Sequence, residues 1–337
     1  MAYYGYGRVI KGVGGLFTVR MLGCEESRHL NPTREAMPLD GKTLVARGRG
    51  NLHRKGSLLV GDLVRVGYDD SSFSVQQGEV IPSTDGTAIV IEEICPRSCA
   101  LIRPPMANLN VLFVTLAAAA PTPILETVDK LISIAEFNGI EPVIVVTKSD
   151  LDPAYARELA ELYRNAGFEV FYEGQGLDGE ADHLREYIQN KLLHGRIAAF
   201  SGASGVGKST MLNRLFPELE LETGEISRRI ERGKNTTRSV ELYPLSEASD
   251  CGYLADTPGF TMLDFERFDF MGKEDLVGTF REFKPYIGAC RYKKCTHTKE
   301  EGCASLSAVQ DQIIPRTRHK SYVSLFNILK EKHDWKK

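Results

Sequence analysis

The sequence predicts a multidomain protein: an N-terminal OB-like β-barrel, a central α/β domain and a mostly helical C-terminal domain. Three observations support this division. Short apolar alternations fill residues 1–97, strand and helix patterns alternate across 98–268, and three cysteines and a histidine cluster within 269–337. A length of 337 residues also favours two or three domains over one.

The composition indicates a globular protein that does not cross a membrane. Apolar residues make up 42% of the chain and charged residues 26%, and no apolar run approaches the ~20 residues of a membrane span. The first residues lack the apolar core of a secretion signal. We therefore expect a cytoplasmic monomer with no membrane partner.

The net charge of −3 hides an uneven distribution. Residues 41–57 carry +5, residues 228–238 carry +4 and residues 284–337 carry +7, so the rest of the chain is strongly acidic. The average charge argues weakly against a nucleic-acid partner, but basic patches on an acidic body are typical of RNA-binding proteins. The distribution therefore favours contact with RNA.

Residues 1–97 are expected to form the barrel. Clusters of Gly, Asp, Asn and Ser separate the apolar alternations, and the polar segment 24–40 is expected to be an inserted loop. Five or six strands with a basic loop fit an OB-like barrel that binds oligonucleotides. An SH3-like barrel, or a barrel with only a structural role, would show the same pattern. The strands are expected near 7–10, 16–19, 43–46, 62–66, 78–81 and 88–91, and the basic loop contains Arg47, Arg49, Arg54 and Lys55.

The central domain is expected to contain parallel βαβ units. Buried strands are predicted at 111–116, 142–147, 168–172 and 196–201, and helices at 124–135, 153–166 and 182–194. Such alternation places ligands at the C-terminal edge of a parallel sheet. Further strands are expected near 240–243 and 252–255.

A glycine-rich phosphate loop follows the strand at 196–201. It consists of Gly202, Ala203, Ser204, Gly205, Val206, Gly207, Lys208, Ser209 and Thr210. A strand before this motif and a short helix after it distinguish it from an ordinary Gly/Ser-rich turn. The glycines let backbone N–H groups surround phosphate oxygens, and the helix N-terminus favours negative charge. Lys208 is expected at the β- and γ-phosphates, and the Ser209 hydroxyl at Mg²⁺.

Two further motifs indicate that the nucleotide is GTP. Asp256 ends a strand, and Gly259 follows three residues later. The Asp256 carboxylate can therefore reach Mg²⁺ through a water molecule, and the Gly259 N–H can approach the γ-phosphate. The guanine-reading element is Thr147, Lys148, Ser149 and Asp150. The Asp150 carboxylate can accept from N1–H and the 2-amine of guanine, a pattern that adenine lacks. Thr147 replaces the usual Asn, and a hydroxyl makes fewer hydrogen bonds than a carboxamide.

These motifs occur in a circularly permuted order. The guanine-reading element precedes the phosphate loop, whereas ordinary GTPases carry it after the D-x-x-G motif. Such a permutation is feasible because the termini of a compact domain often lie close together.

The C-terminal cluster has the spacing of a structural zinc site. Its potential ligands are Cys290, Cys295, His297 and Cys303. This donor set suits one closed, tetrahedral Zn²⁺ per chain, although free thiols in a reducing cytosol are the alternative. Beyond it, Pro315 can begin a helix with one apolar stripe, made by Tyr322, Leu325, Phe326 and Leu329. The basic side chains of this helix, Arg316, Arg318, His319 and Lys320, are expected to face outward.

The barrel, the permuted GTPase motifs and the C-x₄-C-x-H-x₅-C finger together resemble the RsgA (YjeQ) family, which acts in late assembly of the bacterial small ribosomal subunit. The resemblance covers nearly the whole chain, including I-R-P-P-M-A-N-L-N at 102–110 and G-K-N-T-T-R at 233–238 in switch I. It implies binding to the 30S subunit, contact with 16S rRNA through barrel and finger, and subunit-stimulated hydrolysis of GTP to GDP and phosphate. The residues assigned to catalysis are Lys208, Ser209, Thr237, Asp256 and Gly259.

The sequence departs from the family at two places, residue 235 and the stretch 172–174, and from many other GTPases at a third, Phe260. Asn235 replaces a switch I histidine, and Asn cannot act as a base. Phe260 occupies the position where many GTPases place a water-orienting Gln, so slow intrinsic turnover of roughly 10⁻⁴ to 10⁻² s⁻¹ is expected, with a partner adding ~10³–10⁵-fold. The Tyr172-Glu173-Gly174 stretch differs from the Ser-Ala-type turn that supports guanine, so no base contact is assigned there.

Two other functions remain open. A nucleotide-switched RNA-binding protein would hydrolyse almost no GTP even with ribosomes. A P-loop ATPase would lack the Asp150 element.

Overall fold

The chain forms two compact units, each described by itself below. The first unit comprises Met1–Asn110, Tyr187–Ala199 and Glu225–Gly259, and the second comprises Val111–Glu186, Phe200–Gly224 and Phe260–Lys337. The computed structural model describes residues 2–23, 27–31, 37–50, 52, 57–76, 79–83, 88–102, 104–217, 240–246, 251–256 and 271–334. Among these residues, no helix combines the length and the apolar character of a membrane span.

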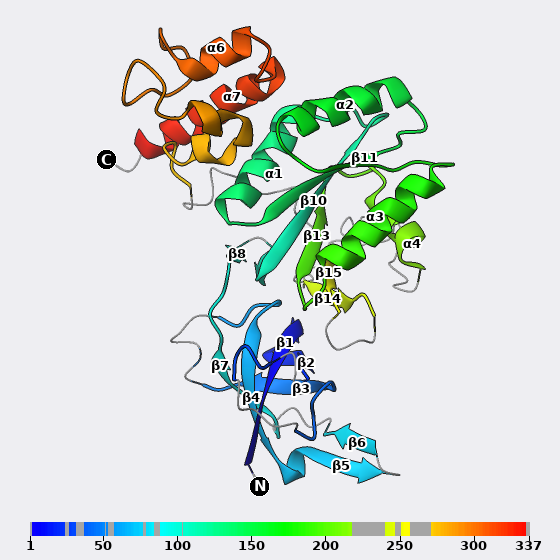
Figure 1. The fold of residues 1–337 in the computed structure, drawn as a ribbon. Helices are drawn as coiled ribbons and strands as arrows, with labels where there is room; N and C mark the ends of the chain where they lie inside the picture. The colour runs from blue at the N-terminus through cyan, green and yellow to red at the C-terminus, as the bar shows by residue number, and fades with distance from the viewer. Residues whose placement is uncertain are drawn as a thin grey trace, which may run out of the picture. The chain divides into compact units, whose positions relative to one another are not determined.

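Five strands close into a barrel in the first unit (Figure 1). They are β1 (Ala2–Val13), β2 (Leu16–Met21), β3 (Thr43–Gly48), β4 (Leu63–Asp69) and β7 (Val90–Ile94). The order is β1-β2-β3-β7-β4, and β4 pairs back onto β1, so the sheet has no free edge within the barrel. Only β3 and β7 run parallel. The predicted OB-like barrel is confirmed.

The barrel interior is filled by alternate side chains of the strands, as a period of two requires. Its largest buried members include Met21, Tyr68 and Ile89. Packing is tight where β1 faces β2, because a Cβ added to Gly7 would lie 2.5 Å from Val19 Cγ1. The strand expected at 78–81 is not part of the barrel: β6 (Glu79–Pro82) forms a separate hairpin with β5 (Phe73–Gln76), which follows a short 3₁₀ turn, η2 (Asp70–Ser72).

The first unit also holds strands from later in the chain. The first three residues of β13 (Ile197–Ser201) pair in parallel with β15 (Tyr253–Asp256). β14 (Glu241–Pro244) runs antiparallel to β15 and also pairs with β1, where Lys11 Nζ lies 2.7 Å from Glu241 Oε2. A short hairpin of β8 (Ala100–Ile102) and β9 (Pro105–Ala107) follows the barrel.

The second unit is built on parallel strands with buried side chains. β11 (Glu141–Thr147) pairs with both β10 (Leu109–Ala117) and β12 (Val170–Tyr172). The helices are α1 (Leu125–Phe137), α2 (Pro153–Asn165), α3 (Asp178–Lys191) and α4 (Lys208–Leu215), and α1 and α2 pack on β11. The strand and helix order predicted for this region is confirmed. However, α3 begins at Asp178, before the expected 182, because acidic side chains in its first turn favour a helix N-terminus.

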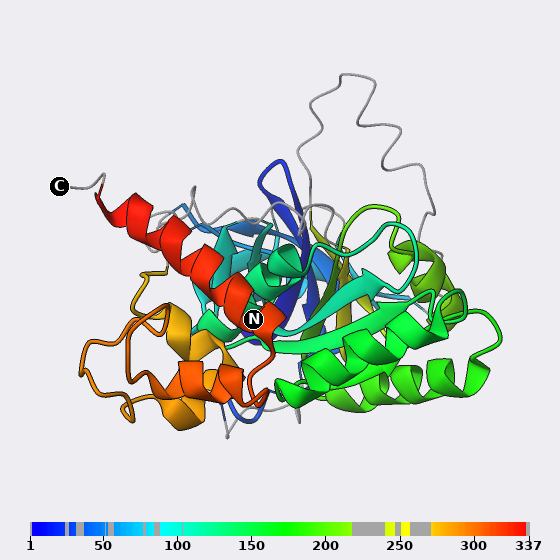
Figure 2. The same ribbon diagram turned by 90° about the horizontal axis from the view of Figure 1, so that it is seen from above.

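The C-terminal segment consists of short helices and one long one. They are η5 (Leu276–Thr279), η6 (Arg281–Tyr286), α6 (Ala304–Gln310) and α7 (Arg316–Asp334). α7 packs against α1 (Figure 2). Its predicted apolar stripe is confirmed, since all four members are buried: Tyr322, Leu325, Phe326 and Leu329.

One expectation for α7 is wrong. Arg318 does not face outward: it is 1% exposed, and its guanidinium Nε donates to Glu282 Oε1 at 2.7 Å. Nη1 also donates to the buried Asp129 carboxylate of α1, and the ring of Phe280 lies 4.5 Å from the guanidinium carbon. His319 is half-buried, whereas Arg316 and Lys320 are exposed as expected. Two carboxylates thus draw the arginine into the core.

Candidate functional site

The phosphate loop is held between β13 and the N-terminus of α4. Gly207 caps the helix with a left-handed backbone (φ 98°), which glycine adopts without strain. Gly202 must also be glycine, because an added Cβ would lie 2.3 Å from Thr115 Oγ1 on β10. Thr115 Oγ1 donates to the carbonyl of Ser201 at 2.6 Å. These contacts fix the loop against the strand.

Lys208 lies over its own loop. Its ammonium donates to the carbonyls of Gly202 (2.7 Å) and Ala203 (3.0 Å), and burial lowers the pKa of the Lys208 ammonium from its usual value. A phosphate that replaced these carbonyls would supply a full negative charge to a partly desolvated cation. Ser209 and Thr210 are exposed, as the loop residues Ala203, Ser204 and Gly205 also are. The loop therefore presents an accessible surface with a cation at its base.

The guanine-reading element predicted from the sequence contacts the phosphate loop directly. The hydroxyl of Thr147, which is fully buried, donates to the carbonyl of Val206 at 2.6 Å. The ammonium of Lys148 donates to the carbonyl of Gly205 at 2.9 Å and also to that of Ala120. Two segments almost 60 residues apart are thereby joined by side chains that donate to backbone carbonyls.

The end of β12 adds a third segment that sequence reasoning missed. Glu173 accepts a backbone hydrogen bond from Ser149 at 3.0 Å, and Gly174 lies against Asp150. Arg214 on α4 forms an ion pair with Glu173 and donates to the carbonyl of Gly174. The available signal was the position of Glu173 and Gly174 at the end of a strand of the parallel sheet, where ligands bind.

The remaining predicted catalytic residues are distributed differently. Asp256 belongs to the first unit, where it ends β15. Thr237 and Gly259, together with Asn235 and Phe260, lie outside the described residues. The second unit therefore brings together the phosphate loop and Thr147 to Asp150, and the catalytic roles stay predictions.

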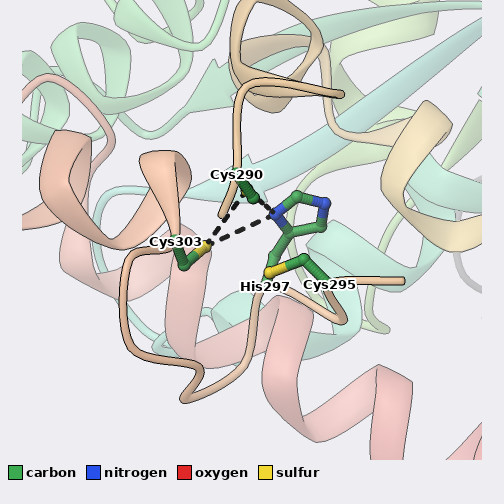
Figure 3. Close-up of side chains that lie close together, drawn as sticks. All are labelled: Cys290, Cys295, His297 and Cys303. Atoms are coloured by element: carbon green, nitrogen blue, oxygen red, sulfur yellow. Dashed lines mark hydrogen bonds between the residues drawn. The ribbon is translucent and has the colours of Figure 1, made fainter. Parts of the chain in front are cut away.

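The four predicted metal ligands converge (Figure 3). One ligand atom from each of Cys290, Cys295, His297 and Cys303 lies within 4.8 Å of the others. Cys290 Sγ lies 3.8 Å from Cys303 Sγ, and both lie 3.5 Å from His297 Nδ1. Tetrahedral zinc with bonds of about 2.3 Å to sulfur and 2.0 Å to nitrogen requires separations of about 3.8 and 3.5 Å. The cluster can therefore hold a metal ion.

Surrounding residues fix the loop that carries these ligands. Glu300 accepts from the backbone N–H groups of Thr296 (2.7 Å) and Thr298 (3.1 Å). Burial raises the pKa of the Glu300 carboxyl, but hydrogen bonds from the Thr296 hydroxyl and from the backbone N–H groups of Thr296, Lys299 and Glu300 outweigh it and lower that pKa to about 2. Tyr322 of α7 donates its hydroxyl to the Thr296 carbonyl at 2.8 Å. The loop that carries the four potential metal ligands and the helix α7 therefore form one packed segment.

Comparisons with known proteins agree with these features of the chain. The RsgA GTPase family model matches residues 94–266. A protein of Caldanaerobacter subterraneus subsp. tengcongensis, named small ribosomal subunit biogenesis GTPase RsgA, is 33% identical, covering 97% of this chain and 96% of its own. A protein of the same name from Moorella thermoacetica is 39% identical over 70% of this chain and 77% of its own.

Two solved structures have the same fold. YloQ, described as a circularly permuted GTPase, superposes with a TM-score of 0.69 at 27% identity, covering 98% of this chain and 96% of its own. YjeQ from Thermotoga maritima gives 0.72 at 25% identity, covering 97% and 99%. The circular permutation and the family expected from the motif order are thus confirmed, and the chain belongs to the RsgA GTPase family.

Proposed function

We propose that this GTPase binds the 30S ribosomal subunit, assists its late maturation, and hydrolyses GTP to GDP and phosphate faster on the subunit than alone. The observation that carries the nucleotide-binding part of the proposal is the bond of Thr147 to Val206, which joins the guanine-reading element to the phosphate loop. The names of the relatives, small ribosomal subunit biogenesis GTPase, support the same role.

Each site residue has a proposed part in this reaction. Lys208 neutralises the β- and γ-phosphates, and Ser209 provides a hydroxyl to Mg²⁺, which supplies charge compensation for the triphosphate. Asp150 reads guanine. Thr237, Asp256 and Gly259 are proposed to complete the site around the γ-phosphate.

Zinc is the metal that fits the Cys₃His set, with one ion per chain in a structural role. We also propose that the boundaries 1–97, 98–268 and 269–337 separate the RNA-binding barrel, the permuted GTPase domain and the zinc-binding domain. Barrel and finger contact 16S rRNA, and the protein acts as a cytoplasmic monomer.

A single-turnover GTPase assay with and without 30S subunits tests the proposal. We expect slow hydrolysis alone and an increase of ~10³-fold or more with subunits. Lys208→Ala should abolish hydrolysis in both cases, because the γ-phosphate loses its fixed cation. Hydrolysis that is negligible even with subunits would favour a nucleotide-switched RNA-binding protein, and equal binding of ATP and GTP would favour a P-loop ATPase.

A further inference from the structure

The carboxylate of Asp150 packs against a glycine that follows β12. A Cβ added to Gly174 would lie 2.3 Å from Asp150 Oδ1 and 2.9 Å from the Asp150 backbone nitrogen. No real Cβ tolerates such distances, so Gly174 leaves room for Asp150 in its present position. The stretch Tyr172-Glu173-Gly174 thus lies against the carboxylate that is proposed to read guanine, although its sequence does not resemble the Ser-Ala-type turn that supports guanine.

This turn is fixed from two sides. On one side, the N–H of Ser149, just after β11, donates to the Glu173 carbonyl at 3.0 Å, and the Glu173 N–H donates to the carbonyl of Val146 on β11 at 2.8 Å. From α4, Arg214 Nη1 donates to the Gly174 carbonyl at 2.6 Å, and Nη2 lies 2.7 Å from Glu173 Oε1. The helix that follows the phosphate loop therefore holds the turn beside Asp150.

The charges explain why an arginine is needed here. Glu173 is only 9% exposed, and burial raises the pKa of its carboxyl. Arg214 lowers that pKa, whereas the nearby Asp150 carboxylate raises it. Glu173 thus interacts with both the Arg214 cation and the Asp150 carboxylate, and without Arg214 the repulsion between the two carboxylates would be uncompensated in a partly desolvated setting.

We propose that Arg214 and the Glu173-Gly174 turn position the Asp150 carboxylate for guanine recognition, with Arg214 acting as a positioning residue. The turn sets where the carboxylate lies, and Arg214 compensates the second carboxylate beside it. Arg214 thereby connects α4, the helix of the phosphate loop, to the turn that lies against Asp150. This inference rests on the proposed binding of GTP by Asp150.

The first test compares GTP with ITP, which lacks the 2-amine that Asp150 accepts from. Gly174→Ala should reduce the ratio of the two affinities by at least about tenfold, the loss of one hydrogen bond to a charged group. Gly179→Ala is the matched control, because nothing lies within 4 Å of a Cβ at that position. A Gly174→Ala protein that folds and keeps the parent's GTP/ITP ratio would overturn the positioning role.

The second test separates charge compensation from general damage. Arg214→Gln should lower the GTP/ITP ratio about tenfold, and adding Glu173→Gln should restore most of it, because the uncompensated carboxylate is gone. Arg164→Gln is the control: Arg164 also donates to a β12 carbonyl, that of Val170, at 3.0 Å. A double variant no better than Arg214→Gln would contradict the compensation argument.

Failure of the proposed function gives a different result. If the parent protein itself binds GTP no better than ITP or ATP, Asp150 does not read guanine and the proposed function is wrong. If the parent prefers GTP and Asp150→Ala abolishes that preference, but the Arg214 and Gly174 variants do not reduce it, only the present inference is wrong. Thermal unfolding midpoints of all variants show whether each protein is folded.

Discussion

The C-terminal segment and the nucleotide site are held together in different ways. In the segment 271–334, a few concentrated contacts dominate: four residues within a stretch of fourteen that can hold a metal ion, and one buried arginine bound by two carboxylates. In the nucleotide site, several modest hydrogen bonds join distant segments, as Thr147 and Lys148 do when they donate to carbonyls of the phosphate loop.

The difference teaches where single substitutions should matter most. A charge or metal contact in a desolvated place is costly to remove, because its partners stay buried without compensation. A neutral hydrogen bond contributes only about 0.5–1.5 kcal/mol net, so a site built from several of them tolerates the loss of one. The predictions below test this contrast.

The largest effect is expected at the metal cluster. A structural zinc supplies about 10–16 kcal/mol of apparent binding energy, so Cys295→Ser should lower the zinc content and unfold the C-terminal segment. GTP affinity should change far less. Metal analysis and circular dichroism measure this, with Cys99→Ser, a half-buried cysteine outside the cluster, as control. Full zinc content in Cys295→Ser would contradict the assignment.

Zinc affinity should also depend steeply on pH. Without metal, burial raises the pKa of the Cys295 thiol to about 12, and burial likewise raises the pKa of Cys303. Cys295 and Cys303 then each release a proton when they bind, so affinity should fall at least about 10²-fold for each unit by which the pH falls. Competition with a chelator at pH 6.5 and 7.5 measures the slope, and a flat profile would exclude thiolate ligation.

The second effect is on stability. Arg318→Met should reduce the free energy of unfolding by about 3–5 kcal/mol, because Asp129 and Glu282 lose their buried cation. Urea unfolding gives the value, and Arg316→Met, at an exposed position of the same helix, is the control. Equal stabilities of the two variants would show that the buried cluster contributes nothing net.

The reduction in unfolding free energy caused by Arg318→Met should become smaller as the pH is lowered. Burial raises the pKa of Asp129 above its unfolded value even in the parent, although Arg318 opposes this. A raised folded-state pKa adds stability below the unfolded pKa, and this is lost as the pH rises through the folded pKa. Removing the Arg318 cation raises the folded-state pKa of Asp129 further. The loss of unfolding free energy in Arg318→Met should therefore be smaller at pH 5 than at pH 8.

The smallest effect is expected in the nucleotide site. Thr147→Val removes the hydroxyl that donates to Val206 and should cost about 1–2 kcal/mol, seen as roughly 5–30-fold weaker GTP binding. Thr147→Ser retains the donor and should stay near the parent. Titration of both variants with GTP measures the effect. Equal GTP affinities of Thr147→Val and Thr147→Ser would show that the hydrogen bond to Val206 does not support the loop.

The sequence predicted the features whose parts lie close together in the chain. The phosphate loop and the Cys/His cluster are defined by spacing over a few residues, because each needs a fixed local geometry. The closed barrel followed from alternation along individual strands. Gly174, by contrast, was marked only by its position after a strand of the parallel sheet, and no local pattern distinguished Arg214 from an ordinary helix residue.

Arg318 shows why the remaining error was made. Its spacing from Tyr322 placed it on the apolar stripe, but its charge suggested an outward position. The carboxylates that stabilise it are 189 and 36 residues away, so only the folded chain reveals them. For a long charged side chain, burial depends on distant partners, which periodicity alone does not identify.

The position of Arg318 near the end of the chain has a consequence for synthesis. Asp129 is translated 189 residues before the guanidinium that neutralises it, and Glu282 36 residues before. While the ribosome elongates the chain from its N-terminus, α1 therefore carries a carboxylate whose buried cation does not yet exist. The core of the second unit is therefore completed only after α7 has been made, and the burial of Asp129 is compensated late in synthesis.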